Sequence, residues 1–205
     1  MQYFIPFTVG FLAAFLGLLA PAMLNMTAAK ISIEKNKKSG IEFSLGAIVV
    51  VFIQAYIAVA FAKPLVNNPS IIAKLKIAAV FILSGLAFFF FIKAKQQFKT
   101  SSKKQRFGSF ISGISLSALN MLAVPFYLAM ATLAESKQWI QLKSPDTILY
   151  VSGATLGSFT IFASYVFLAN HIAKRIQFIA TNINYVLSGL FLVLALITSY
   201  QVIIV

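Results

Sequence analysis

The sequence predicts an all-α, polytopic membrane protein with six transmembrane helices, arranged as two inverted three-helix repeats. Three observations predict it: an apolar composition, six apolar stretches of membrane-spanning length, and short motifs that occur in both halves of the chain. Of the 205 residues, 60% are hydrophobic and only 10% are charged, whereas soluble domains carry about 25% charged residues. A chain of this composition is an integral membrane protein.

Each span is predicted from its length. A helix needs about 20 apolar residues to cross a hydrocarbon core of about 30 Å at a rise of about 1.5 Å per residue. Strands of a membrane barrel are shorter, about ten residues, and alternate strictly. The predicted spans are Phe4–Thr27, Phe43–Ala62, Ile77–Ile92, Phe107–Leu133, Ile148–Ala169 and Ile179–Tyr200. No basic segment precedes the first stretch, so we expect it to be retained as a span and not removed as a signal peptide.

Basic residues lie in the connections between the spans. The first, third and fifth connections carry twelve Lys and Arg together, and the second and fourth carry five. Because basic residues are retained on the cytoplasmic face, we expect both termini to lie outside, in a multi-pass protein of the inner (cytoplasmic) membrane. This bias accounts for the net charge of +13 without a nucleic acid partner. Trp139 and Tyr150, near predicted span ends, are expected in the interfacial aromatic belts.

Motifs that recur between the halves predict an internal duplication. The repeated pairs are Met23-Leu24-Asn25-Met26 with Ala118-Leu119-Asn120-Met121, Gly46-Ala47 with Gly153-Ala154, and Leu83-Ser84-Gly85-Leu86 with Leu187-Ser188-Gly189-Leu190. We therefore predict a single membrane domain, residues 1–205, with a first repeat at 1–92, a basic cytoplasmic linker at 93–106 and a second repeat at 107–205. Three spans is an odd number, so the second repeat enters the membrane from the opposite side. The Ser-Gly pairs are expected to mark close helix packing.

The first and fourth predicted spans each contain an asparagine near a proline. A proline inside a helix removes a donor and displaces the carbonyl four residues earlier. In lipid the freed groups need partners, so such breaks occur where they line a cavity, and paired breaks in inverted repeats form the substrate sites of many secondary transporters. The candidate substrate-binding residues are Asn25, Asn120, Pro21, Pro125 and Gln54, the last because an amide is costly in lipid. The alternative is that the asparagines only join helices, at about 0.6 kcal/mol per hydrogen bond.

Several short motifs match those of a known family: Pro21-Ala22-Met23, Lys37-Lys38-Ser39-Gly40, Leu45-Gly46, Phe107-Gly108-Ser109-Phe110, Leu119-Asn120-Met121-Leu122 and Leu187-Ser188-Gly189. On these motifs the whole chain resembles the LysE-type translocators, as a divergent member. Ala22 and Met23 stand where the family has the Gly and second Pro of its break, and Met121-Leu122 stands where it has Pro-Lys. The resemblance implies six hydrophobic segments in the inner membrane and export of amino acids.

The sequence and the resemblance together predict a secondary transporter that exports an amino acid or a similar small zwitterionic solute by alternating access. A half-helix N-terminus would hold the substrate carboxylate, and Glu42 is the carboxylate nearest to a span for the substrate ammonium. The alternatives are a passive channel or a non-transport assembly factor on the same scaffold. We expect no enzyme, cofactor or metal site, because no Ser/Lys, Asp/Asp or His cluster is visible and cysteine is absent. The expected partners are the small-molecule substrate and membrane lipid, and a homo-oligomer is compatible with the sequence.

Overall fold

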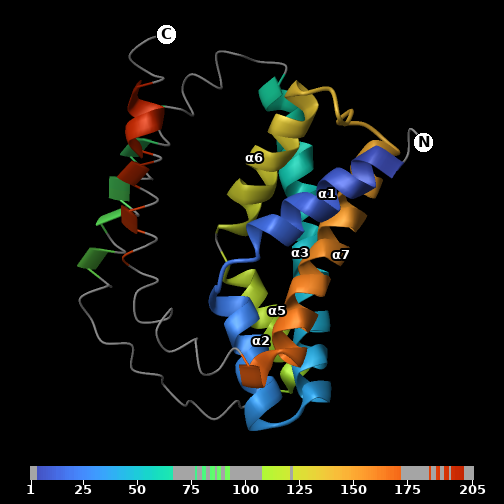
Figure 1. Ribbon diagram of the computed structural model, residues 1–205. Helices are drawn as coiled ribbons and strands as arrows, with labels where there is room; N and C mark the ends of the chain where they lie inside the picture. Colours follow the sequence, from blue (N-terminus) through green and yellow to red (C-terminus); the bar gives the residue numbers. More distant parts are fainter. Residues whose placement is uncertain are drawn as a thin grey trace. The chain divides into compact units, whose positions relative to one another are not determined.

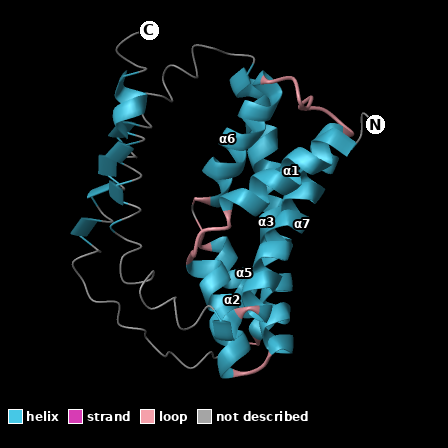
Figure 2. Ribbon diagram, in the orientation of Figure 1, coloured by secondary structure: helices cyan, strands magenta, loops and turns pink. Residues whose placement is uncertain are grey.

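The computed structural model describes residues 4–66, 108–120 and 122–171 continuously, and positions 77, 80, 81, 84, 85, 87, 88, 91, 92, 185, 188, 189, 192, 193 and 195–200 individually. The chain divides into two compact units. One comprises Met1–Val66 with Lys103–Ala173, and the other comprises Asn67–Ser102 with Lys174–Val205. All regular secondary structure of the described residues is helical (Figure 2), which agrees with the predicted all-α fold class.

The first unit is a bundle of helices, labelled in Figure 1. Its helices are α1 (Phe4–Gly17), α2 (Met23–Glu34), α3 (Lys37–Val66), α5 (Ser109–Ala118), α6 (Ala123–Ser136) and α7 (Asp146–Phe167). Two of them, α3 over Lys37–Ala62 and α7, are long and apolar enough to cross a membrane, and α5 with α6 qualifies as one span bent by 66°. The described residues therefore contain two, or with the bent pair three, candidate membrane spans, and α1 is a shorter apolar helix.

The second and fifth predicted spans correspond to α3 and α7, and the first and fourth are each divided into two helices. The predicted spans Ile77–Ile92 and Ile179–Tyr200 are described only in part, at nine and eleven positions respectively, and the linker 93–106 lies outside the described residues. Within the second unit, the Ser188 hydroxyl donates to the Ala87 carbonyl at 2.9 Å. A side chain at Gly85 or Gly189 would meet no described atom within 4 Å, so the described contact of these Ser-Gly pairs is made by the serine hydroxyl.

The first connection is shorter than the sequence predicted. α2 continues to Glu34 and α3 begins at Lys37, so only two residues separate helices that were expected to be 15 residues apart. No helix breaker lies in this segment, and Lys30 pairs with Glu34 one turn later at 3.7 Å. The side chain of Asn36 then accepts the Ser39 N–H at 2.8 Å and caps the start of α3.

Glycines bring α1 and α7 into backbone contact. A Cβ at Gly10 would collide with the Tyr150 carbonyl oxygen, and a Cβ at Gly153 would collide with the Phe7 carbonyl oxygen. Each helix thus supplies a glycine that receives a carbonyl of the other. Close approach through small residues is how helices pack in a membrane, where no hydrophobic effect separates helix from lipid.

The same reciprocal contact joins α5 to α3. A Cβ at Gly113 would collide with the Phe43 carbonyl oxygen, and a Cβ at Gly46 would collide with the Phe110 carbonyl oxygen. Gly10 and Gly113 are 103 residues apart, and Gly46 and Gly153 are 107 apart. The first helix of each half therefore packs on the long helix of the other half through glycines at nearly constant separation.

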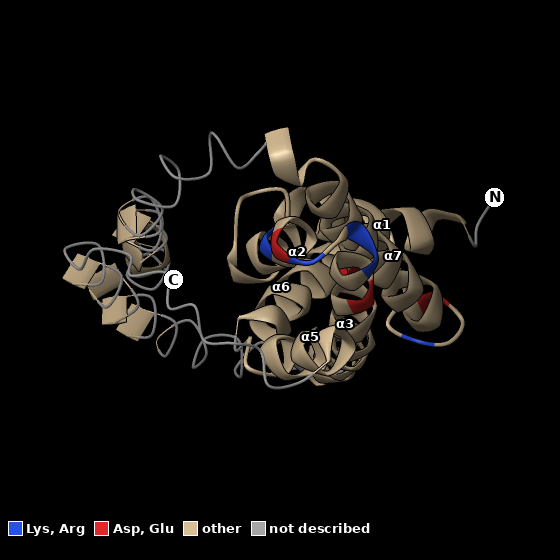
Figure 3. Ribbon diagram, turned by 90° about the horizontal axis from the view of Figure 1, so that it is seen from below, with Lys and Arg blue, Asp and Glu red and all other residues tan. Residues whose placement is uncertain are grey.

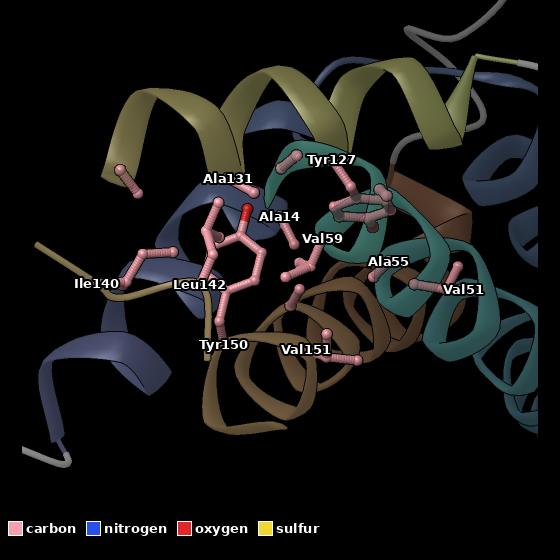
Figure 4. Packing of buried hydrophobic residues seen from close by; sticks show 14 of the residues in the cluster. Ala14, Val51, Ala55, Val59, Tyr127, Ala131, Ile140, Leu142, Tyr150 and Val151 are labelled. Carbon is pink, nitrogen blue, oxygen red and sulfur yellow. The ribbon is translucent and has the colours of Figure 1, made fainter. Parts of the chain in front are cut away.

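Two apolar clusters fill the bundle. The first (Ala14, Val51, Ala55, Ala58, Val59, Ala62, Ala123, Tyr127, Ala131, Ala134, Ile140, Leu142, Tyr150, Val151 and Ala154) lies among α1, α3, α6 and the start of α7 (Figure 4). The second (Leu24, Ala28, Ala29, Ile31, Phe43, Ala47, Ile161, Phe162, Tyr165, Val166 and Ala169) lies among α2, the start of α3 and the end of α7. α1 and α6 contribute buried residues to the first cluster and α2 contributes to the second, against which Leu116 of α5 and Phe15 of α1 also pack.

The surface of the first unit is apolar along its length, and its charges lie at its ends. Phe52, Ile53 and Tyr56 of α3 are among many large apolar side chains that are about half exposed. Described lysines lie in or near the α2–α3 connection, near the end of α3 and in the α6–α7 connection; the two connections are at opposite ends of the bundle (Figure 1). Seen end-on, the helices carry only a few charged positions (Figure 3). An apolar girdle between charged ends is the surface of a membrane protein.

Candidate functional site

The first break lies between α1 and α2, at residues 18–22, where the sequence predicted an interrupted helix. α1 ends at Gly17, the residue whose carbonyl a proline ring at Pro21 would displace from a continuous helix. Ala22 then has an extended backbone, with φ −133° and ψ 172°, and α2 begins at Met23. The proline therefore accounts for the end of one helix and the start of the next.

Asn25 supplies the hydrogen bonds that the first break leaves open. Its side chain is 1% exposed. Its Oδ1 accepts the Ala22 N–H at 2.6 Å, and its Nδ2 donates to the carbonyls of Leu18 and Ala20 at 3.0 and 2.9 Å. Both hydrogens of the side-chain amide are therefore donated to backbone carbonyls, and in this structure the side chain stabilises the conformation of the break.

A second side chain reaches the first break from α7. The Tyr165 hydroxyl donates to the Leu19 carbonyl at 2.9 Å. Leu19 belongs to the break, and a carbonyl there has no helical partner. Because α7 belongs to the other half of the chain, the conformation of this break is coupled to a helix that follows it by more than a hundred residues.

We expect Tyr165→Phe to lower the free energy of unfolding by about 1 kcal/mol, the net value of a hydrogen bond to a backbone carbonyl. The change keeps the ring and removes only the hydroxyl that binds Leu19. Thermal melting of the purified protein in detergent measures the effect. Tyr56→Phe is the control, since Tyr56 lies half exposed on α3, and an equal loss in both variants would contradict the assignment.

The second break lies between α5 and α6. α5 ends at Ala118 and α6 begins at Ala123. Pro125 is the third residue of α6, a position in the first turn where a missing N–H costs little. Its ring would displace the carbonyl of residue 121, so the helix cannot continue backwards into α5. Pro125 itself is exposed to the surroundings of the bundle, and Pro21 is half-buried.

Gln54 of α3 makes side-chain hydrogen bonds to the backbone of the second break, as Asn25 does at the first break. The side chain is 9% exposed, and its Nε2 donates to the Ser117 carbonyl at 3.1 Å and more weakly to the Asn120 carbonyl at 3.5 Å. These carbonyls lie at the C-terminal end of α5 and just beyond it, and each also accepts one backbone N–H, from Asn120 and from Ala123 respectively. The Gln54 Oε1 and the Ser117 hydroxyl are buried and have no hydrogen-bond partner among the described residues.

The two asparagines occupy different positions. Asn25 is the third residue of α2, after its break, whereas Asn120 lies inside the other break, three residues before α6. Pro21 and Pro125 are 104 residues apart, close to the separations of the packed glycines, whereas Asn25 and Asn120 are 95 apart. By separation along the chain the prolines match the glycine pairs better than the asparagines do, but Pro21 lies within its break and Pro125 lies in the first turn of α6. Asn120 is half-buried. It contacts Gln54 through its backbone carbonyl, and no hydrogen bond of its side chain is described.

The burial of two tyrosines, one near the start of α6 and one near the start of α7, was not anticipated. Tyr127 is almost fully buried, and its hydroxyl shares a 2.9 Å hydrogen bond with the Ser158 hydroxyl of α7. Tyr150 is completely buried beside Ala131 and Val151 in the first cluster (Figure 4), so its expected place in an interfacial belt is wrong. A tyrosine near a span end reaches the membrane interface only if the neighbouring helices leave it uncovered. Trp139, the other residue expected in an interfacial belt, is half exposed.

A shallow hollow of about 270 Å³ lies elsewhere, between α3 and α7. Its lining is Ile48, Phe52, Ser152, Thr155, Leu156 and Phe159, and includes none of the break residues. Phe52 and Leu156 are also widely exposed on the outside of the bundle. This hollow therefore belongs to the apolar outer surface, and the chemistry of the site lies at the breaks.

Apolar helices of spanning length, glycine-mediated contacts and buried polar groups at two helix breaks together define a helical membrane protein. A family model described as LysE type translocator matches residues 3–201, essentially the whole chain. The chain belongs to the LysE type translocator family, and it is therefore a membrane translocator. No curated protein and no solved structure matches the chain significantly.

Proposed function

We propose that the protein is a secondary transporter that exports an amino acid, or a similar small zwitterionic solute, from the cell by alternating access. The observation that carries the proposal is the pair of helix breaks at residues 18–22 and 119–122, both furnished with buried polar side chains. A helix that only fills a membrane has no use for such breaks, since each frees backbone groups that need partners. Interrupted helices near the middle of a bundle are the usual substrate site of secondary transporters.

The architecture we propose is a pair of inverted three-helix repeats. The reciprocal glycine contacts support it. Gly10 of α1 lies against the Tyr150 carbonyl of α7, and Gly113 of α5 lies against the Phe43 carbonyl of α3. The long helices make the same kind of contact in the other direction, through Gly153 of α7 and Gly46 of α3. Equivalent contacts made from both halves are what a pseudo-two-fold arrangement requires. Exchange of the two halves' conformations would convert an inward-open state into an outward-open state.

In this proposal the substrate carboxylate binds at the start of α2. The first turn of a helix has N–H groups without helical partners and a partial positive charge. Just before α2, the Ala22 N–H donates to the Asn25 side chain. The first helical hydrogen bond of α2 runs from the Met26 N–H to the Ala22 carbonyl. The N–H groups between them are those that a carboxylate would accept from. Asn25, by fixing Ala22, positions this end of the helix.

Transport by purified protein in vesicles tests the proposal. We expect saturable counterflow of at least one member of a panel of labelled zwitterionic amino acids, with efflux that responds to an imposed pH gradient. Linear flux that neither saturates nor shows counterflow would favour a channel, and no flux of any panel member would contradict transport of this solute class. Accessibility labelling of cysteines introduced at both termini tests the inverted arrangement, which requires both termini on the same face; the bias of the basic residues predicts that this is the outer face.

A further inference from the structure

Two buried polar atoms beside the second break have no hydrogen-bond partner in the described part of the chain. They are the Gln54 Oε1 and the Ser117 Oγ, from side chains that are 9% and 0% exposed. Gln54 reaches the residue that bears the second atom, because the Gln54 Nε2 donates to the backbone carbonyl of Ser117. A buried, unpaired acceptor costs roughly 1–3 kcal/mol, so two at one place indicate a group that occupies the site.

The orientation of Gln54 is fixed by its neighbours. The carbonyls of Ser117 and Asn120 can only accept hydrogen bonds, so the amide NH₂ faces them and the Oε1 faces away. The partner that the Oε1 needs is therefore a hydrogen-bond donor. The Ser117 hydroxyl can accept from the same donor, and the C-terminal end of α5 adds a partial negative charge.

We infer that Gln54 and Ser117 form the binding site for the primary ammonium group of the transported solute. An ammonium carries three donors and a positive charge, which match two unpaired acceptors beside a helix C-terminus. No cluster of acidic or histidine side chains suited to a divalent metal occurs in the described part of the chain. With the carboxylate at the start of α2, the first break would bind the carboxylate of a zwitterion and the second break would bind its ammonium group. The inference rests on the proposed function only in assigning the ammonium to a transported solute.

Methylammonium and tetramethylammonium provide the test, because they carry the same charge and only the first donates hydrogen bonds. We expect the melting temperature of the full-length protein in detergent to rise, with saturation, as methylammonium chloride replaces tetramethylammonium chloride at constant chloride concentration. Replacement by sodium chloride is expected to give no such rise. Gln54→Leu and Ser117→Ala should each raise the apparent Kd for methylammonium about tenfold or more, since each removes an acceptor for a charged donor.

Ser109→Ala is the matched control, because Ser109 is a buried serine of the same helix and should leave the affinity unchanged. If Gln54→Leu fails to fold, Ser117→Ala decides the question, since it removes only an unpaired hydroxyl. An equal response to sodium would assign the site to an inorganic cation, and no response to any cation would assign it to water; either result overturns the inference. Methylammonium binding without amino-acid transport would uphold this site and contradict the proposed function.

Discussion

Asn25→Ala is expected to destabilise the folded protein by about 2–4 kcal/mol and to abolish export. The side chain makes three hydrogen bonds, to the Ala22 N–H and to the carbonyls of Leu18 and Ala20, in a setting that is almost completely buried. Its removal leaves those groups unpaired, at about 1–3 kcal/mol for each group that water does not reach. Thermal melting in detergent measures the stability, and counterflow in vesicles measures the transport.

Two matched variants separate this role from a general cost of losing an asparagine. Asn36→Ala removes one exposed cap, the bond from the Ser39 N–H, and is expected to cost about 1 kcal/mol without loss of transport. Asn120→Ala removes a half-buried side chain inside the other break, and is expected to abolish export while the protein stays folded. If Asn25→Ala were as stable as wild type, its three bonds would not be what holds the first break.

The difference between the asparagines shows what the sequence could and could not predict. The prolines located both breaks, because the clash of a proline ring with the carbonyl four residues earlier is a local property of the chain. Gly17 ends α1 four residues before Pro21, as that rule requires. The sequence could not predict that Asn25 lies after its break and Asn120 inside it, because that depends on where each second helix restarts.

The long-range partners of the breaks were also beyond a reading of local sequence. Gln54 was a candidate because a mid-span amide is costly, but its partner, the Ser117 carbonyl, is 63 residues away. The link from Tyr165 to Leu19 spans 146 residues. Such pairs are set by how α3 and α7 pack on the broken helices, and that packing follows from glycines whose contacts are invisible until the helices meet.

These glycines give the second large prediction. We expect Gly153→Ala to destabilise the protein by about 3 kcal/mol or more, because the added Cβ would collide with the Phe7 carbonyl oxygen of α1. Neither backbone can yield without separating the helices, and overpacking of this kind typically costs about 1–3 kcal/mol, occasionally more. Helix propensity acts in the opposite direction, since alanine is about 1 kcal/mol better than glycine within a helix. A measured loss would therefore understate the cost of the collision.

Gly85→Ala is the control, because Gly85 is also helical but a Cβ there meets no described atom within 4 Å. We expect it to be neutral or slightly stabilising, so the two variants should differ in sign in the same melting experiment. The reciprocal site sharpens the argument: Gly46→Ala would collide with the Phe110 carbonyl of α5 and should cost as much as Gly153→Ala. Equal costs would indicate that both halves use one packing arrangement. A large cost at only one of the two sites would contradict the symmetry on which the proposed exchange of inward-open and outward-open states depends.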